Sequence, residues 1–384
     1  MTAASVSVAA SSSDLSRAAL ARVRPDVRAM HAYAVQDARG LLKLDAMENP
    51  YGLPPALQAE LGARLGALAL NRYPGERGED LKRALAAYAQ LPEGHALMLG
   101  NGSDELIGLL AMACDLPGAT ILAPAPGFVM YAMSAQMQGL RYVGVPLTAD
   151  FELDEAAMLA AIAKEKPAIL YLAYPNNPTA NAWDPAVIRR LVAAQGAQGG
   201  LVVIDEAYQP FANHSWIEEI RKDLAAHAHV LLMRTLSKFG LAGVRLGYLI
   251  GPAALVAEID KVRPPYNVSV LNCECALFAL EHAEVFAQQA AAIRAERTQL
   301  LAQLAGLSGV KVWPSDANMV LIRVLGGAEG AHDRADAVFA GMKQRGVLVK
   351  NVSRMHPLLA QCLRLTVGTA DDNARMVEAL RQSL

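Results

Sequence analysis

The stretch RTLSKFGLAGVRLGY (234–248) places a single lysine, Lys238, among small and apolar residues, with Arg245 seven positions later. Lys238 follows directly on an apolar run, and such surroundings lower the pKa of an amine. An unprotonated amine is a nucleophile that can attack the aldehyde of a cofactor. A solvated loop lysine is the alternative interpretation of the same stretch.

A second candidate is VVIDEAY (202–208), where a hydrophobic run ends in Asp205 and Glu206, with Tyr208 two residues beyond. A carboxylate at a buried strand end needs a cationic partner to offset its desolvation. A protonated pyridine nitrogen would be such a partner. Helix capping by either acid is the alternative.

Two more constellations follow predicted strands, the place where ligands collect in open α/β sheets. In LGNGSDELIGLL (99–110) two glycines precede a helix whose first turn carries Ser103. Free backbone N–H groups there can hold a phosphate, whereas a Ser-capped helix is the alternative. The second, YPNNPTAN (174–181), is a turn after an apolar strand and could be simple chain reversal.

Short β-rich runs alternate with segments of helical period, which indicates a parallel sheet covered by helices and hence the α/β class. The predicted strands are 119–124, 168–175, 200–207, 229–237 and 245–251, and clear helices are 80–91 and 106–114. After about residue 275 a long helical segment precedes three strand-like runs, ANMVLIRV (317–324), GVLVKNVS (346–353) and CLRLTVGT (362–369).

This change of pattern predicts three parts. Residues 1–40 form an N-terminal tail and arm, residues 41–275 a large domain, and residues 276–384 a smaller α+β domain that packs with part of the N-terminal segment. The first twenty residues have neither a basic start nor a continuous apolar run, so we expect no signal peptide and no membrane span. A cytoplasmic location follows as an expectation.

The composition favours small-molecule partners. The 384 residues carry a net charge of −2, which provides no basic footprint for nucleic acid and no polybasic run for a membrane. The four cysteines are too few for a disulfide framework, so we expect reduced thiols. None of the eight histidines stands in a metal-binding pattern, and we expect no metal.

Taken together, the four stretches resemble the pyridoxal-phosphate aminotransferases of fold type I over roughly residues 40 to 375. Asn177, Asp205, Tyr208, Lys238 and Arg245 stand in that family's order. The resemblance implies pyridoxal 5'-phosphate as cofactor, held by the large domain. It implies that Lys238 holds the cofactor and shuttles a proton, and that Asp205 pairs with the pyridine nitrogen.

The same resemblance implies further roles. Asn177 and Tyr208 would bond the 3-oxygen of the ring, and Phe128 of PAPGFVMY would stack on its face. The phosphate would be held by Gly102, Ser103, Asp104, Ser237 and Arg245. Two departures from the family pattern are present. SKFGLAG is one residue shorter than in several relatives, and Ala180 stands where the common motif has glycine.

Within these enzymes, LDAMENPYG (44–52), NRYPGERGEDLKRALAAY (71–88) and CLRLTVGT (362–369) are similar to histidinol-phosphate aminotransferases. That similarity implies a homodimer in which Tyr73 reaches the partner's cofactor phosphate. It implies transfer of an amino group between L-histidinol phosphate or imidazole-acetol phosphate and glutamate or 2-oxoglutarate, in histidine biosynthesis. Substrate-binding residues would be Tyr51, Asn177 and Arg364, with Lys350 or Arg354 as a second cation.

Three alternatives remain open at this point. An aromatic amino-acid aminotransferase would share every cofactor residue, and an amino-acid phosphate decarboxylase would share the fold while releasing carbon dioxide. A cofactor-sensing regulatory domain could use the same pocket. It would need a DNA-binding module, and the forty or so residues before LDAMENP show no basic helix-turn-helix.

Overall fold

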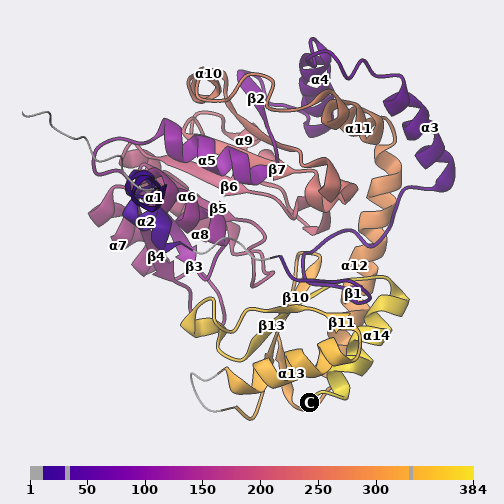
Figure 1. Cartoon of the computed structure of the whole chain (residues 1–384). Coiled ribbons are helices and arrows are strands. Elements are labelled where there is room, and N and C mark those ends of the chain that lie inside the picture. Colours follow the sequence, from indigo (N-terminus) through magenta and orange to yellow (C-terminus); the bar gives the residue numbers. More distant parts are fainter. Residues whose placement is uncertain (1–11, 31–34, 328–331) are drawn as a thin grey trace, which may run out of the picture. The chain divides into compact units, whose positions relative to one another are not determined.

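A computed structural model describes residues 12–30, 35–327 and 332–384 (Figure 1). The chain divides into two units, residues 1–37 and residues 38–384. In the first unit lie two short helices, α1 (Ser12–Leu20) and α2 (Pro25–Ala29). All of the strands within the described residues lie in the second unit. Within the described ranges, no helix is both long and apolar enough to cross a bilayer.

A seven-stranded sheet forms the larger part of the second unit, with strand order β2-β8-β7-β6-β5-β3-β4. The strands are β2 (His95–Gly100), β3 (Thr120–Ala125), β4 (Arg141–Pro146), β5 (Ile169–Ala173), β6 (Leu201–Asp205), β7 (Val230–Thr235) and β8 (Gly247–Pro252). Strand β8 runs antiparallel to both of its neighbours, β2 and β7, and the other strands of this sheet share one direction. The predicted mainly parallel sheet is therefore confirmed, and the five predicted runs correspond to β3, β5, β6, β7 and β8.

The two edge strands, β2 and β4, were not among the strands predicted from the sequence. Strand β4 is exposed or half-buried at every position except Val145, contains Gly144 and ends at Pro146. Glycine and proline are both unfavourable in strands, and proline is tolerated mainly at edges. Edge strands therefore carry a weaker sequence signal than the apolar central strands.

Both faces of the central sheet are buried. Leu170 and Leu172 belong to one apolar cluster, whereas the alternate residues Ile169 and Tyr171 belong to another. Because successive side chains of a strand point to opposite faces, these two clusters cover the two sides of the sheet. This two-sided burial explains why the central strands are continuous apolar runs.

Helices supply the other half of each cluster. One face is covered by α4 (Arg77–Ala89), α7 (Glu155–Glu165), α8 (Pro185–Ala197), α9 (Trp216–Lys222) and α11 (Val270–Glu281). The other is covered by α5 (Ser103–Ala113), α6 (Val129–Gln138) and α10 (Ala253–Asp260). Helix α3 (Pro55–Gly66) packs on α11.

A four-stranded antiparallel sheet, in the order β12-β13-β10-β9, forms the remainder of the second unit. Its strands are β9 (Val310–Val312), β10 (Met319–Val324), β12 (Lys350–Asn351) and β13 (Cys362–Thr366). Its helices are α12 (Ala283–Ala305), α13 (Asp333–Gln344) and α14 (Ala370–Arg381). The predicted run 346–353 forms two separate strands. Strand β12 belongs to the four-stranded sheet, whereas β11 (Val347–Leu348) pairs with β1 (Leu42–Lys43) in a sheet of two strands.

The third apolar cluster joins this sheet to an early part of the chain. Leu44 and Met47 pack together with residues of β10 and β13. The predicted division of 41–275 from 276–384 would cut through α11, and as a division into domains it stays a prediction.

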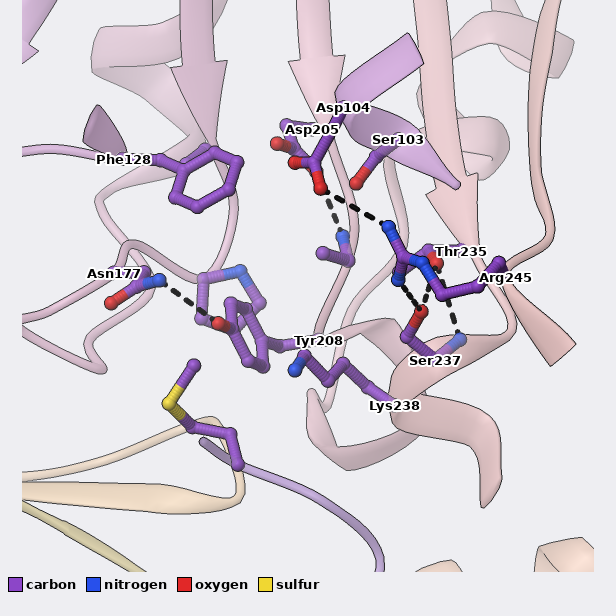
Figure 2. Close-up of a pocket in the computed structure, with 14 residues that line it drawn as sticks. Ser103, Asp104, Phe128, Asn177, Asp205, Tyr208, Thr235, Ser237, Lys238 and Arg245 are labelled. Atoms are coloured by element: carbon purple, nitrogen blue, oxygen red, sulfur yellow. Dashed lines mark hydrogen bonds and ion pairs between the residues drawn. The ribbon is translucent and has the colours of Figure 1, made fainter. Parts of the chain in front are cut away.

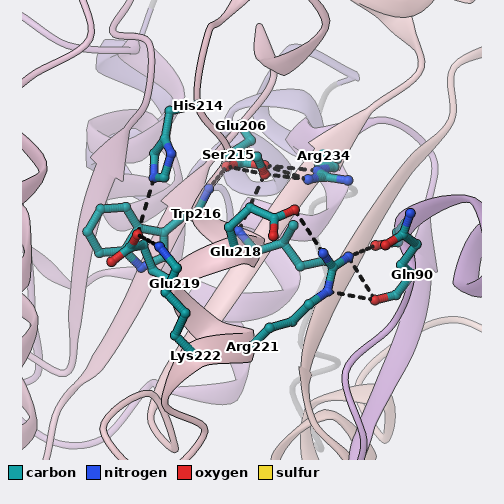
Figure 3. A network of polar contacts seen from close by, with 12 residues as sticks. Gln90, Glu206, His214, Ser215, Trp216, Glu218, Glu219, Arg221, Lys222 and Arg234 are labelled. Carbon is teal, nitrogen blue, oxygen red and sulfur yellow. Dashed lines mark hydrogen bonds and ion pairs between the residues drawn. The ribbon is translucent and has the colours of Figure 1, made fainter.

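A buried ion pair lies beside the end of β6 (Figure 3). Glu206 accepts hydrogen bonds from Arg234 Nε at 2.9 Å and from Ser215 Oγ at 3.0 Å. It also accepts from the backbone N–H of Trp216, at the start of α9, so part of the helix-capping interpretation holds for this acid. Arg234 lies on β7, and the pair therefore ties the turn after β6 to the neighbouring strand.

We expect Arg234→Met to lower the free energy of unfolding by about 3–5 kcal/mol, because Glu206 would remain buried without its cation. Urea denaturation monitored by fluorescence measures this change. Arg190→Met is the matched control, since it removes a partly exposed pair with Glu155 and should leave the free energy of unfolding nearly unchanged. Equal destabilisation by the two substitutions would contradict the importance of the buried pair.

Candidate active site

A cavity lies at the carboxyl ends of β5, β6 and β7, where parallel strands bring distant segments to one edge (Figure 2). Every residue predicted to bind the cofactor lines it, except Gly102 and Tyr73. The lining residues are Met47, Ser103, Asp104, Phe128, Ala173, Pro175, Asn177, Asp205, Ala207, Tyr208, Thr235, Ser237, Lys238 and Arg245.

One end of the cavity is suited to an anion. Helix α5 begins at Ser103, and no side chain caps it, so the N–H groups of its first turn remain available. The Ser-capped helix considered from sequence is therefore absent. Arg245 donates to Ser237 Oγ at 3.3 Å and to Asp104 Oδ2 at 3.2 Å, and these groups surround the helix start.

Gly102 belongs to the same end of the cavity. It adopts φ +83, and a Cβ at this position would lie 2.6 Å from Arg245 Nη2. Any larger residue would therefore displace the guanidinium. The helix start, the glycine and the arginine together fit the phosphate of a cofactor.

Lys238 lies in a π-helical turn, η2 (Ser237–Leu241), directly after β7. The side chain is half-buried, and Nζ donates to the carbonyl of Ala46 at 2.9 Å. Burial, together with the positive charges of Arg364 and Arg245, lowers the pKa of Lys238 to about 8. The solvated-lysine alternative does not hold, and close to pH 8 about half of the amine is unprotonated.

Asp205 ends β6 and is buried. Its Oδ1 accepts from the N–H of Ala207 at 3.0 Å, and its Oδ2 accepts from the Tyr131 hydroxyl at 2.6 Å. Burial raises the pKa of Asp205 to about 6. Both donors are neutral, so a cation inside the cavity would stabilise the charged carboxylate. A protonated pyridine nitrogen fits this position.

Hydrogen bonds among Asn177, Tyr208 and Arg364 link the cavity to β13. Asn177 Nδ2 donates to the Tyr208 hydroxyl at 3.0 Å, and Arg364 Nη1 donates to Asn177 Oδ1 at 2.6 Å. Arg364 Nη2 donates to the carbonyl of Asp45 at 2.8 Å. Burial raises the pKa of Tyr208, while Arg364 opposes the shift, so the hydroxyl stays protonated and can donate a hydrogen bond.

The remaining predicted residues do not line the cavity. Lys350 is the cross-strand partner of Arg364. Arg354 is paired through Nη2 with Asp336 at 2.5 Å, and its side chain is 68% exposed. Tyr51 is half-buried against the cluster of the four-stranded sheet.

Tyr73 lies on the surface. It is 74% exposed, and its ring stacks on that of Tyr266 at 4.2 Å between centroids.

Several lining residues were not predicted from sequence. Thr235 belongs to the lysine stretch, and its Oγ1 donates to Ser237 Oγ at 3.0 Å. Met47 belongs to LDAMENPYG, so both lay within stretches already singled out. Tyr131, which contacts Asp205, lay just beyond Phe128 and carried no signal of its own.

Left-handed backbone occurs at Ala180 and at Arg245, which follows the shortened SKFGLAG stretch. Ala180, at the position of the common glycine, adopts φ 70, and Arg245 adopts φ 54. For residues with a Cβ this conformation costs about 1–2 kcal/mol. At Ala180 it is maintained by backbone hydrogen bonds to Asn176 and from Asp316.

Comparison with known proteins supports the same assignment. Residues 39–380 match the family model described as aminotransferase class I and II. The chain belongs to this family. Its members use pyridoxal 5'-phosphate, the cofactor that the cavity fits.

Relatives of high identity cover nearly the whole chain. The histidinol-phosphate aminotransferase of Acidovorax sp. strain JS42 is 71% identical over 367 residues, 95% of this chain and 98% of the relative. That of Paracidovorax citrulli is 68% identical over 376 residues, 97% of this chain and 100% of the relative.

A solved structure is similar in fold: the Sinorhizobium meliloti histidinol-phosphate aminotransferase in complex with pyridoxal-5'-phosphate. It has a TM-score of 0.80 at 23% identity, covering 94% of this chain and 97% of that one. An L-threonine-O-3-phosphate decarboxylase from Porphyromonas gingivalis has a TM-score of 0.73 at 21% identity, covering 88% of this chain and 98% of that one. The fold alone therefore does not separate transamination from decarboxylation.

We expect cofactor loading to speed up with pH, because only the unprotonated amine of Lys238 reacts and its pKa is about 8. The rate at which cofactor-free protein gains visible absorbance after addition of pyridoxal phosphate should rise through pH 8 and then level off. Borohydride should then fix the cofactor to Lys238. Equal rates at pH 6 and pH 9, or a label on another lysine, would contradict this role.

Proposed function

We propose that this chain transfers an amino group between L-histidinol phosphate or imidazole-acetol phosphate and glutamate or 2-oxoglutarate, as a cytoplasmic enzyme of histidine biosynthesis. The observation that carries the substrate assignment is the 68–71% identity to histidinol-phosphate aminotransferases over at least 95% of the chain. The chemistry itself is supported by a lysine of lowered pKa and a buried carboxylate that line the same cavity.

When bound, the cofactor would supply an electron sink for the negative charge that develops at the substrate Cα. Asp205 holds its charge against the pyridine nitrogen and keeps that nitrogen protonated. Lys238, about half unprotonated near pH 8, would move the proton between the substrate Cα and the cofactor C4′. Phe128 would stack on the ring, Tyr208 and Asn177 would bond its 3-oxygen, and the groups around the start of α5 would bind the phosphate.

Arg364 is the proposed anchor for the anionic end of the substrate. Asn177 and the Asp45 carbonyl each accept from one of its nitrogens, and these contacts orient the guanidinium. A guanidinium fork binds a phosphate or a carboxylate bidentately, so this residue serves both substrates of the reaction.

Lys350 is the better candidate for the second cation. Residues directly opposite each other on antiparallel strands present their side chains on the same face, so Lys350 and Arg364 are neighbours. Arg354 is instead engaged with Asp336 and largely exposed. A phosphate dianion gains more from two adjacent cations than a carboxylate does.

The deciding assay compares kcat/KM for histidinol phosphate with that for phenylalanine and tyrosine, with 2-oxoglutarate as the amino acceptor. The proposal requires histidinol phosphate to be the best of the three donors. A preference for the aromatic amino acids would favour an aromatic aminotransferase. Stoichiometric release of carbon dioxide from an amino-acid phosphate would favour the decarboxylase.

We expect Lys350→Ala to lower kcat/KM for histidinol phosphate about 5- to 50-fold relative to that for glutamate, because the phosphate loses a charge-assisted contact. Arg354→Ala is the matched control from the same segment and should leave this ratio nearly unchanged. Steady-state kinetics with both donors measures it. An unchanged ratio in Lys350→Ala would remove the lysine from the substrate site.

The same proposal includes a homodimer with composite sites. Tyr73 does not line the cavity of its own chain, and it forms an exposed stack with Tyr266. Leu70 is 66% exposed close by in sequence, so the segment presents apolar and aromatic surface. Such surface is typical of the buried centre of an interface between subunits.

Mixing a Tyr73→Ala chain with a Lys238→Ala chain should therefore restore activity that neither variant has alone. A hybrid dimer contains one site built from the intact half of each chain. Turnover after subunit exchange, with exchange followed by a size or fluorescence label, measures the recovery. No recovery despite complete exchange would exclude a site shared through Tyr73.

A further inference from the structure

We infer that Tyr131 is a positioning residue for the cofactor ring: one side chain that orients the carboxylate of Asp205 and supports the stacking ring of Phe128. This inference rests on the proposed function and concerns how the site holds the pyridine. Tyr131 is buried in α6 and donates its hydroxyl to Asp205 Oδ2 at 2.6 Å.

The ring of Tyr131 is held between two aromatic neighbours. It stacks on Tyr171 at 4.3 Å between centroids and 9° between planes. It meets the edge of Phe128 at 5.7 Å and 86°. A ring packed in this way has no room to swing, so its hydroxyl is kept aimed at Asp205.

Helix α6 couples the two contacts. Phe128 is the N-cap residue of α6, and Tyr131 lies three positions later, within the first turn. Residues three apart lie on the same side of a helix. The start of α6 therefore positions two side chains at once. They are Phe128, whose ring would stack on the pyridine, and Tyr131, whose hydroxyl orients the carboxylate of Asp205.

The hydroxyl can act only as a donor to Asp205. Burial and the charge of Asp205 raise the pKa of Tyr131, so the hydroxyl does not ionise in the working range. A hydrogen bond donated to a carboxylate favours its charged form. It therefore opposes the effect of burial on Asp205, which must stay ionised to hold a proton on the pyridine nitrogen.

The other charged groups around Asp205 act differently. Asp104 and Glu206 repel its charge and raise its pKa. The Lys238 amine and the Arg245 guanidinium line the same cavity, without a hydrogen bond to Asp205 within the described part of the chain. None of these four changes when the Tyr131 hydroxyl is removed.

The test uses Tyr131→Phe, which removes the hydroxyl and keeps the ring. Without this donor Asp205 should draw the proton of the pyridine nitrogen towards itself, and the ring should withdraw electrons less strongly. The pH midpoint of the visible absorbance of the bound cofactor should rise, and the affinity of the cofactor-free protein for pyridoxal phosphate should fall several-fold. We expect kcat to fall about tenfold, with KM for the amino donor nearly unchanged.

Tyr171→Phe is the matched control. It removes a hydroxyl from the stacked neighbour, and that hydroxyl has no hydrogen-bond partner in the part of the chain that the structure describes. The midpoint and the affinity should stay at the wild-type values. Tyr131→His restores a hydrogen-bond donor on a ring. It should bring the pH midpoint of the visible absorbance part of the way back to the wild-type value.

A double-mutant cycle with Asp205→Asn tests the route of the effect. If Tyr131 acts through the carboxylate, Tyr131→Phe should add no shift in the Asp205→Asn background. An additive shift would overturn the inference. So would equal shifts in Tyr131→Phe and Tyr171→Phe, or a lowered melting temperature with an unchanged midpoint.

These spectral measurements need no amino donor. A protein that binds pyridoxal phosphate at Lys238 but does not act on histidinol phosphate would refute the proposed function. The inference about Tyr131 would stand in that case, because its evidence is the midpoint and the cofactor affinity.

Discussion

The structure depends on one electrostatic constraint, the carboxylate of Asp205 at the end of a strand that is buried on both faces. Burial raises its pKa to about 6, and its two hydrogen-bond donors are neutral. A charged carboxylate in such a place requires a cation. The parallel sheet brings the carboxyl ends of three strands to this point, and the cavity next to it has room for a cationic ring.

The adjacent acid shows how the protein keeps Asp205 available. Successive residues of an extended chain point in opposite directions, so Glu206 turns away from the cavity and pairs with Arg234. That pair anchors the turn after β6 to β7, the strand that leads into Lys238. Of these two consecutive carboxylates, Glu206 stabilises the fold, and Asp205 remains available to the cofactor.

Charge also connects the two sheets. Arg364 reaches from β13 to Asn177 and to the carbonyl of Asp45, and Lys238 donates to the next carbonyl, that of Ala46. The positive charge of Arg364 contributes to the lowered pKa of Lys238. The proposed anchor of the substrate therefore also helps to keep the nucleophilic amine unprotonated, although the two residues lie far apart in sequence.

The sequence by itself determined the α/β class, the five central strands and the stretches that line the cavity, because two-sided burial leaves continuous apolar runs and the family motifs are local. It did not reveal the edge strands β2 and β4, and for β4 the mostly exposed or half-buried residues give a weak pattern. Only the tertiary structure decided which distant groups meet. The Tyr131 bond to Asp205 and the pairing of Lys350 with Arg364 depend on helix packing and strand register, which no local pattern encodes. Likewise, the positive φ of Ala180 follows from the backbone bonds around it rather than from its residue type.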